Sequence, residues 1–331
     1  MKLFRIAAAS VVATFAATVS FAQDKVTFGT NWLAQAGHGG YYQAVADGTY
    51  EKYGLEVDIQ MGGPQVNNRP MLPAGKLDFL MGGNMLQAFD SVRNGIPVTV
   101  VASIFQKDPQ AILAHKGVYK DFADVANAPK IYIGKDAQFS FWKWMTVNHG
   151  FKDENLAPYA YNIGPFLVDE KAVQQAFATA EPIYAANEGV ETDIFLLADY
   201  GWDTYSTTIE ARTQMIEENP DLVNRFVEAS IIGWYNFMYG DNQPAFDLIK
   251  EANPEMTDEK LAKEVEYLKA LGIVDSGLAL EKGIGAMDPA RTAKFLKAME
   301  DSGIVDKGSV DLDLVANYSF VNQGLGMDLR K

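Results

Sequence analysis

Three side chains suited to holding a small molecule follow the first predicted strand of this chain. Trp32, Gln35 and His38 come directly after a β-rich run at residues 25–31. An indole ring stacks on flat molecules, whereas an amide and an imidazole exchange hydrogen bonds with them. The spacing predicts a binding loop. The alternatives are that Trp32 fills the core of its domain and that His38 caps the entry to the following helix.

Two more polar residues follow later strands. Asn84 comes after Gly82 and Gly83, between a buried strand expected at 77–81 and a helix. The unpaired backbone N–H groups at that helix start can meet a ligand acceptor, and Asn84 also suits an ordinary N-cap. Gln106 follows the strand expected at 98–104. Ligands of open α/β sheets bind beyond the carboxyl ends of the strands, where we expect both residues to lie.

The second half of the chain supplies three further candidates. Gln138 and Phe139 open a helix after a strand expected at 130–134. The aromatic residues that follow have helical spacing, so we expect them to pack inside and only Phe139 to reach a ligand. Glu181 precedes a proline and either contacts ligand or shapes a turn. Additional candidates near strand ends are Tyr161, Asn162, Asp199, Tyr200 and Trp202.

The residues that enzymes need are missing from these loops. The chain has no cysteine, and its histidines are His38, His115 and His149, which lack metal-ligand spacing. There is no nucleophile elbow, no P-loop and no complete dinucleotide fingerprint. We therefore expect a protein that is not an enzyme and that uses no metal and no cofactor.

The N-terminus has the pattern of a cleaved secretory signal. Lys2 and Arg5 precede an apolar run at 6–19, and residues 20–22 form a small-x-small cleavage site. No cysteine follows to carry a lipid, so we expect a free protein in a bacterial periplasm. The formal net charge of −15 argues against nucleic acid or an anionic membrane as a partner.

The order of the predicted elements indicates an α/β fold with two lobes. Strands at 25–31, 55–61, 77–81 and 98–104 alternate with helices, which implies a mainly parallel sheet with right-handed crossovers. The strict alternation at 55–61 places that strand toward a sheet edge. A second series comprises strands at 130–134, 158–162 and 192–198 and helices at 138–149 and 169–177.

From about residue 209 the chain is expected to be mostly helical. Asn219-Pro220 and Asp288-Pro289 are typical helix starts, and the apolar residues at 261–271 have amphipathic helical spacing. We expect this tail to return to the first lobe. The predicted organisation is a signal at 1–22, lobe 1 at 23–112 and 208–331, and lobe 2 at 113–207.

Several of these runs resemble one family. Residues 32–41, Trp-Leu-Ala-Gln-Ala-Gly-His-Gly-Gly-Tyr, and residues 48–57 are similar to the opening of the ABC-transporter binding proteins for thiamine-pyrimidine precursors and for sulfonate or nitrate. Further matches lie at 75–79, 95–98, 179–182 and 219–226, so the resemblance spans nearly the whole mature chain. It implies a type II periplasmic binding protein, whose lobes close on a ligand in the interlobe cleft and then dock on a permease.

The spacing of Trp32 and His38 resembles the pyrimidine branch of this family more than the sulfonate branch. In that branch an aromatic residue stacks on the ring, and a Glu in the position of Glu181 resembles one that hydrogen-bonds ring substituents. The residues between Trp32 and His38 differ from the Pro-Asn-rich version of that branch.

We therefore predict a monomeric solute-binding component of an ABC importer. It would capture a small flat heterocycle, such as a thiamine-type pyrimidine precursor, and deliver it to membrane permease subunits. The alternative ligand is a small oxyanion such as sulfonate or nitrate. Such a ligand would need basic side chains, and the predicted loops contain Lys135 but no Arg. A third reading, a related cytosolic pyrimidine synthase, is disfavoured by the export signal and the missing cysteines.

Overall fold

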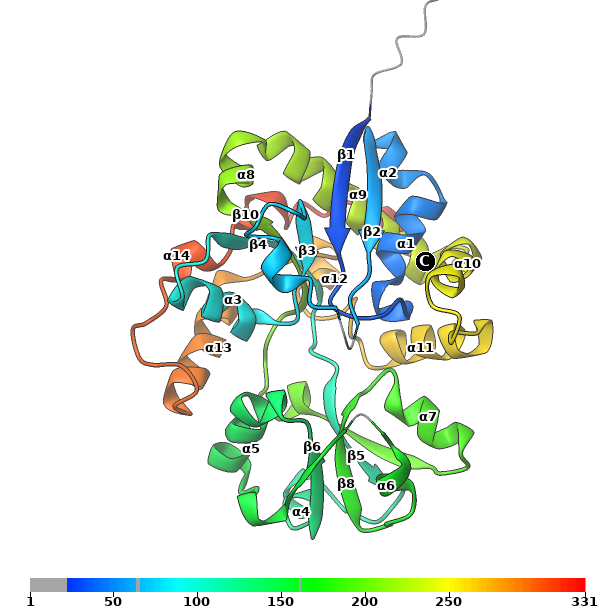
Figure 1. Ribbon diagram of the computed structural model, residues 1–331, viewed down its shortest axis with the longest axis vertical. Coiled ribbons are helices and arrows are strands. Elements are labelled where there is room, and N and C mark those ends of the chain that lie inside the picture. Colours follow the sequence, from blue (N-terminus) through cyan, green and yellow to red (C-terminus); the bar gives the residue numbers. More distant parts are fainter. Residues whose placement is uncertain (1–22, 64–65, 161, 331) are drawn as a thin grey trace, which may run out of the picture.

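The computed structural model describes residues 23–63, 66–160 and 162–330. These residues form two five-stranded sheets, each in its own lobe, and Figure 1 shows one lobe above the other. The predicted signal at 1–22 and the candidate Tyr161 lie outside the described residues. Within the described ranges no helix has the length and apolar character needed to cross a membrane.

The first sheet has the strand order β2-β1-β3-β10-β4. Its strands are β1 (Asp24–Gly29), β2 (Leu55–Gln60), β3 (Phe79–Met81), β4 (Val98–Phe105) and β10 (Ser206–Arg212). β1 runs parallel to β2 and β3, whereas β10 runs antiparallel to β3 and β4. The edge position predicted for the strand at 55–61 is confirmed. The strand β10 was missed, because the chain from 209 onward was expected to be mostly helical.

The second sheet has the strand order β7-β6-β8-β5-β9. Its strands are β5 (Gln110–His115), β6 (Lys130–Ile133), β7 (Leu156–Pro158), β8 (Ala172–Phe177) and β9 (Thr192–Leu196). β6 is parallel to β7 and β8, whereas β5 is antiparallel to β8 and β9. The helix predicted at 169–177 is wrong. β8 is a central strand buried on both faces, so its sequence lacks the alternation that marks a half-exposed strand.

Each sheet is mixed, because β10 and β5 run against the other four strands of their sheets, which share one direction as predicted. β5 and β10 are also the strands that follow the two passages of the chain between the lobes, at 106–109 and at 197–205. The predicted boundaries at 112/113 and 207/208 fall inside these strands. Because β5 pairs with the second sheet and β10 with the first, both crossings come a few residues earlier than predicted.

Helices cover the faces of both sheets (Figure 1). Those of the first lobe are α1 (Gly39–Ala46), α2 (Thr49–Lys52), α3 (Met85–Arg93), α8 (Thr213–Glu218), α9 (Pro220–Tyr239), α10 (Gln243–Ala252), α11 (Asp258–Ala270), α12 (Ala279–Lys282), α13 (Pro289–Asp301) and α14 (Leu312–Val315). Those of the second lobe are α4 (Phe122–Val125), α5 (Phe141–His149), α6 (Gly164–Leu167) and α7 (Glu181–Asn187). Short 3-10 helices used below are η1 (Ala36–His38), η3 (Asp136–Phe139) and η5 (Leu197–Tyr200).

The predicted helix starts in the tail are confirmed. Pro220 is the first residue of α9, and Asp288 caps α13 by accepting the backbone N–H of Ala290 at 2.9 Å. These local signals act within one helical turn and need no tertiary contact. The tail packs on the first sheet and returns to lobe 1 as expected, since α9 lies against α1.

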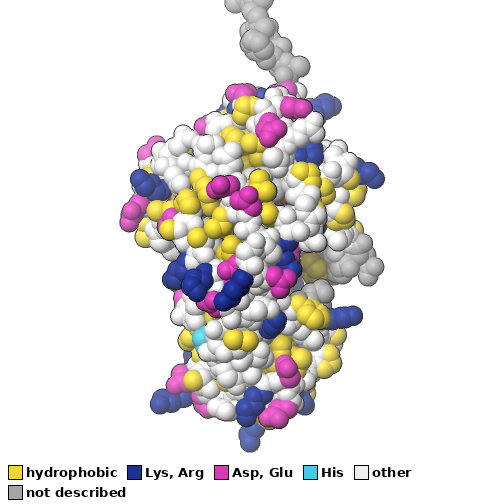
Figure 2. Space-filling view, turned by 90° about the vertical axis from the view of Figure 1, so that its left-hand side faces the viewer, with side chains coloured by type: hydrophobic (Ala, Val, Ile, Leu, Met, Phe, Trp, Pro, Cys, Tyr) yellow, Lys and Arg dark blue, Asp and Glu magenta, His cyan; other side chains and the backbone are white. Residues whose placement is uncertain are grey.

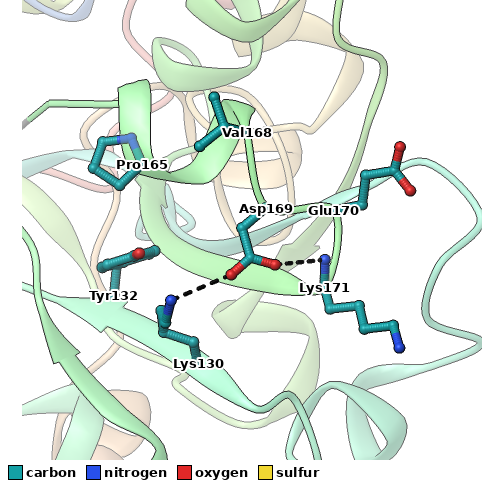
Figure 3. Close-up of a pocket in the computed structure, with 7 residues that line it drawn as sticks. All are labelled: Lys130, Tyr132, Pro165, Val168, Asp169, Glu170 and Lys171. Carbon is teal, nitrogen blue, oxygen red and sulfur yellow. Dashed lines mark hydrogen bonds and ion pairs between the residues drawn. The ribbon is translucent and has the colours of Figure 1, made fainter.

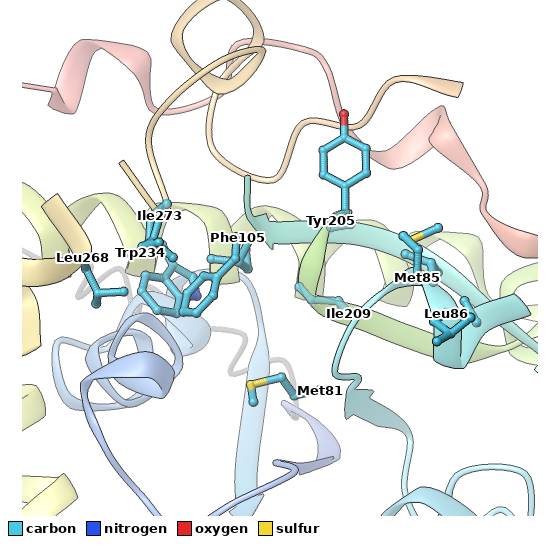
Figure 4. Packing of buried hydrophobic residues seen from close by; sticks show 14 of the residues in the cluster. Met81, Met85, Leu86, Phe105, Tyr205, Ile209, Trp234, Leu268 and Ile273 are labelled. Atoms are coloured by element: carbon cyan, nitrogen blue, oxygen red, sulfur yellow. The ribbon is translucent and has the colours of Figure 1, made fainter. Parts of the chain in front are cut away.

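Glycines allow α1 and α9 to approach closely. A Cβ atom on Gly40 would lie 2.2 Å from Cγ of Trp234, and one on Gly233 would lie 2.3 Å from the carbonyl oxygen of Gly40. Both distances are shorter than real side chains tolerate. Figure 4 shows Trp234 packed with Phe105 beside Leu268, and the Phe105 and Trp234 ring centroids are 5.8 Å apart. The glycines after His38 therefore serve the packing of the helix that carries the first candidate loop.

Charged side chains mark the level at which the lobes meet. Figure 2 views the face formed by α13 and α5 and shows Lys and Arg gathered there beside acidic groups. Arg291 of α13 lies 2.8 Å from a carboxylate oxygen of Asp203 in the second crossing. Nearby, Asn148 at the end of α5 donates to the hydroxyl of Ser302 at 3.0 Å. The lobes are thus in contact along the side on which the crossings run.

Candidate functional site

The loops at the carboxyl ends of the strands meet between the lobes. β4 ends at Phe105 immediately before the first crossing, and β1, β2 and β3 point the same way because β10 is antiparallel to both β3 and β4. β5 begins after that crossing, so its antiparallel neighbour β8 ends there, together with β6 and β7. The interlobe region is therefore the expected ligand site of this topology.

Trp32 lies on the surface of the loop after β1. Its side chain is 39% exposed, and its backbone oxygen accepts the hydroxyl of Thr30 at 2.8 Å. The alternative that Trp32 fills the core is wrong. Gln35 is half-buried at the start of η1, where its carbonyl oxygen accepts the backbone N–H of His38 at 2.9 Å. The turn fixed by this bond holds the loop that carries Trp32.

His38 is buried at the junction of η1 and α1. Only 1% of the residue is exposed, and its Nδ1 has no hydrogen-bond partner. Burial lowers the pKa of His38 to about 3, so the ring is neutral at physiological pH. Its side chain makes no capping bond, so the helix-cap alternative is wrong. The predicted ligand contact of His38 stays a prediction, since the ring lies below the surface.

Asn84 is an N-cap whose two amide atoms are both engaged. Its Oδ1 accepts the backbone N–H of Leu86 at 3.1 Å, and its Nδ2 donates to a carboxylate oxygen of Asp108 at 2.9 Å. The neighbouring backbone N–H groups are also bonded: that of Gly82 to the Thr208 carbonyl and that of Gly83 to the Gln87 side chain. The free amides predicted at this helix start are therefore used inside the protein.

Asp108 joins the first crossing to the second. Besides Asn84, its carboxylate accepts the indole N–H of Trp202 at 3.1 Å and the backbone N–H of Gln110 at 3.2 Å. Burial raises the pKa of Asp108, against the lowering effect of these donors. Trp202 is fully buried between Trp144 of α5, at a ring-centroid distance of 5.5 Å, and Phe295 of α13, at 5.3 Å. These contacts place Asp108 and Trp202 at the pivot between the lobes.

Gln106 also serves the crossing. It is 1% exposed; its Nε2 donates to the Ala286 carbonyl at 2.9 Å, and its backbone carbonyl accepts Arg291 at 2.6 Å. These bonds tie the tail of the chain to the end of β4. The amide oxygen of Gln106 has no partner. Gln106 therefore lies below the surface of the loops at the strand ends.

The second lobe presents Phe139 and Glu181. Phe139 is 74% exposed at the end of η3, next to the half-buried Gln138, whereas the aromatic residues after it are buried as expected. Glu181 is the first residue of α7, and its Oε2 accepts the backbone N–H of Phe177 at 2.7 Å while its Oε1 accepts the Tyr159 hydroxyl at 3.3 Å. Burial raises the pKa of Glu181. The carboxyl therefore shapes the turn before α7, whereas the predicted ligand contact of Glu181 stays a prediction.

The additional candidates near the strand ends have structural partners. The side-chain oxygen of Asn162 accepts the Gly164 N–H at 2.9 Å, and Asp199 pairs with Lys107 at 2.9 Å beside the crossings. Tyr200 stacks on Phe122 at a centroid distance of 4.2 Å. One residue that the sequence reasoning missed is Glu264 of α11, whose carboxylate accepts the backbone N–H of Ala36 at 2.8 Å. No local pattern separates this residue from the other acidic residues of its helix.

A surface depression on lobe 2 lies away from the cleft. Figure 3 shows Tyr132 and Asp169 lining it, with Lys130 bound to Asp169 at 3.3 Å. Lys130 begins β6 and Asp169 precedes β8, so the depression lies at the amino ends of the strands. In the described part of the chain, no three His, Cys, Asp or Glu side chains are grouped so that they could hold a metal ion.

The two lobes, each with a five-stranded sheet, and the loops that meet between them define a periplasmic binding protein fold. The chain belongs to the family described as NMT1/THI5 like, which matches residues 35–243. The riboflavin-binding protein RibY of Chloroflexus aurantiacus is 26% identical over 316 residues, which cover 91% of this chain and 87% of that protein.

Solved structures share the fold at lower identity. The periplasmic aliphatic sulphonate binding protein SsuA of Escherichia coli aligns with a TM-score of 0.64 at 15% identity, covering 88% of this chain and 91% of that chain. The periplasmic nitrate-binding protein NrtA of Synechocystis PCC 6803 aligns with a TM-score of 0.60 at 13% identity, covering 93% of this chain and 89% of that chain. The desulfurization enzyme DSZB has a TM-score of 0.57 at 12% identity, and the alignment covers 92% of this chain and 100% of that chain. The fold is therefore shared by binding proteins and by an enzyme.

Proposed function

We propose that this protein captures a small flat heterocycle between its lobes in the periplasm and delivers it to an ABC permease. The observation that carries this proposal is the pair of exposed aromatic rings at Trp32 and Phe139. They lie in loops that follow β1 and β6, one in each lobe, at the ends of the sheets that face one another. Two rings on opposite walls of a closing cleft suit a ligand with two flat faces.

The ligand class includes thiamine-type pyrimidine precursors and larger flat rings such as flavins. The relative RibY is a riboflavin-binding protein by name, and flavins and pyrimidines share a planar nitrogen-containing ring. Such rings also present N–H groups or ring nitrogens at their edge. The amide of Gln138, next to Phe139, and the carboxyl of Glu181, which follows β8 in the same lobe, suit that edge.

A small oxyanion suits these loops less well. The backbone N–H groups around Asn84 are bonded internally, and those of Ala137 and Gln138 in η3 donate to the carbonyls of Gly134 and Lys135. Lys135 is exposed. An anion would therefore meet few free donors there.

A thermal-unfolding panel on ligand-stripped protein tests the proposal. Riboflavin, an aminopyrimidine precursor of thiamine, an alkanesulfonate and nitrate are each added at a fixed excess. A ligand at about a hundred times its Kd adds roughly 2.7 kcal/mol to the free energy of unfolding, which raises Tm by several degrees. We expect a flat ring to raise Tm, whereas a rise with sulfonate or nitrate alone would refute the ring-binding proposal.

Substitutions of the two rings make the test specific to the site. Trp32→Ala and Phe139→Ala should each weaken binding of the active ring compound by at least tenfold, about 1.4 kcal/mol, because a stacking face is lost. Leu314→Ala is the matched control, since Leu314 is 55% exposed on α14, outside the loops at the strand ends. Unchanged affinity in both aromatic variants would remove them from the site.

A further inference from the structure

Glu264 connects α11 to the first candidate loop. Its Oε2 accepts the backbone N–H of Ala36 at 2.8 Å, although the two residues are 228 positions apart in the sequence. Ala36 begins η1, between Trp32 and His38. Only 3% of Glu264 is exposed. A side chain of the C-terminal tail therefore holds the loop that presents Trp32.

The same helix faces the second lobe. α11 contacts α7, and Figure 1 shows the two helices opposite one another at the edge where the lobes meet. The ammonium group of Lys260 lies 5.9 Å from the ring centroid of Tyr184 on α7. Glu181 is the first residue of α7, so this contact brings a second carboxyl to the lobe 2 side of the interface. This contact lies away from the crossings, on which α13 packs.

The groups that face Glu264 are mostly acidic or neutral. Titratable and charged residues surround it from five segments. They are Lys260 of α11, Glu255 before that helix, His38 of η1, Glu181 and Tyr184 of α7, and Tyr159 after β7. Of these described residues only Lys260 carries a positive charge, and its ammonium donates to the carbonyl of Glu255 at 3.0 Å. Glu264 and Glu181 thus lie on two contacting helices of different lobes, with Lys260 as the one cation among the residues named.

Burial makes ionisation of these carboxyls costly while α11 and α7 are in contact. It raises the pKa of Glu264 from 4.5 to about 8, with Ala36 and Lys260 opposing the rise and Glu181 adding to it. It also raises the pKa of Glu181. When the lobes separate, water reaches the interface, and burial then raises the pKa of the two carboxyls less.

We propose that Glu264 is a positioning residue that couples the Trp32 loop to the closing of the lobes, and that closing takes up a proton at the Glu181–Glu264 pair. The proposal rests on the proposed function only in that the lobes of a binding protein open and close. The closed form is then favoured most below the ordinary pKa of Glu. The ratio of closed to open protein falls by up to about tenfold per pH unit above it and levels off once the pH exceeds about 8.

Small-angle X-ray scattering of the ligand-free protein at pH 5.5 and pH 9 tests this coupling. The wild type should have a smaller radius of gyration at pH 5.5 than at pH 9. Glu264→Gln keeps an oxygen that accepts the Ala36 N–H but cannot ionise, so it should remain compact at both values. Glu266→Gln is the matched control, because Glu266 lies on the same helix, is exposed and pairs with Lys263. It should expand like the wild type.

The outcome does not depend on knowing the ligand. A wild-type radius of gyration equal at both pH values, or a Glu264→Gln variant that expands as the wild type does, overturns the proposal and leaves the flat-ring proposal untouched. If Glu264→Gln fails to fold by circular dichroism, Glu181→Gln tests the pair from the other lobe. It should reduce the pH-dependent expansion, and an unchanged expansion refutes the coupling.

Discussion

Asp108 is hydrogen-bonded to three parts of the chain: one in lobe 1, one in lobe 2 and one in the second crossing between them. Its carboxylate receives N–H groups from Asn84 in a lobe 1 loop, from Trp202 in the second crossing and from Gln110 at the start of β5. Asp108→Asn turns one acceptor position into a donor, so at least one of these buried N–H groups loses its partner. We expect the free energy of unfolding to fall by about 3 kcal/mol, measured by urea denaturation.

The neighbouring Asp199 supplies the control for that prediction. Asp199 also lies beside the crossings, but it pairs with Lys107 and its side chain is 53% exposed. Asp199→Asn should change the free energy of unfolding by less than about 1 kcal/mol, as exposed ion pairs contribute little. Equal losses in the two variants would mean that the hydrogen-bonded cluster at Asp108 adds nothing beyond its charge.

At the scale of elements, the close approach of α1 and α9 governs the first candidate loop. Gly40→Ala would place a methyl group 2.2 Å from the Trp234 ring, so α1 must shift away from α9. Over-packing of this kind costs about 1–3 kcal/mol of stability, and the shift moves η1 and Trp32 with the helix. We expect a lower Tm and weaker binding of whichever ring compound raises the Tm of the wild type.

Gly37→Ala is the matched variant for Gly40→Ala. Gly37 lies three positions earlier in η1, and the nearest atom to an added Cβ is the Gln35 side-chain nitrogen at an ordinary 3.5 Å. Its Tm should change little. A Gly40→Ala protein as stable as Gly37→Ala would show that the helices have room to adjust.

Elements with strong local signals could be predicted from the sequence, and those made by long-range pairing could not. Asp288 and Asn84 cap helices as their residue types indicated, and β2 is the alternating edge strand. β8 and β10 were not recognised, because a buried strand between two neighbours has no alternation and gains its bonds from distant residues. Glu264 was not recognised as a residue of the candidate site for a similar reason, since its partner Ala36 lies far away in the sequence.

At the scale of the whole molecule, lobe 2 is one continuous segment and lobe 1 is not. The ends of lobe 2 lie side by side, because Ala111 of β5 pairs with Leu196 of β9. We expect a fragment of residues 109–198 to fold alone, with strand and helix signals in circular dichroism and a cooperative thermal transition. A fragment without a transition would show that lobe 2 depends on its contacts with Trp202 and α13.

The position of β10 has a consequence for the order of folding. β10 fills the space between β3 and β4, yet it comes after the whole of lobe 2 in the sequence. During synthesis, β10 therefore cannot pair with β3 and β4 until about a hundred more residues have left the ribosome. This delay follows from the long sequence separation of the paired strands. The second lobe can form first, while the first sheet stays incomplete until β10 arrives.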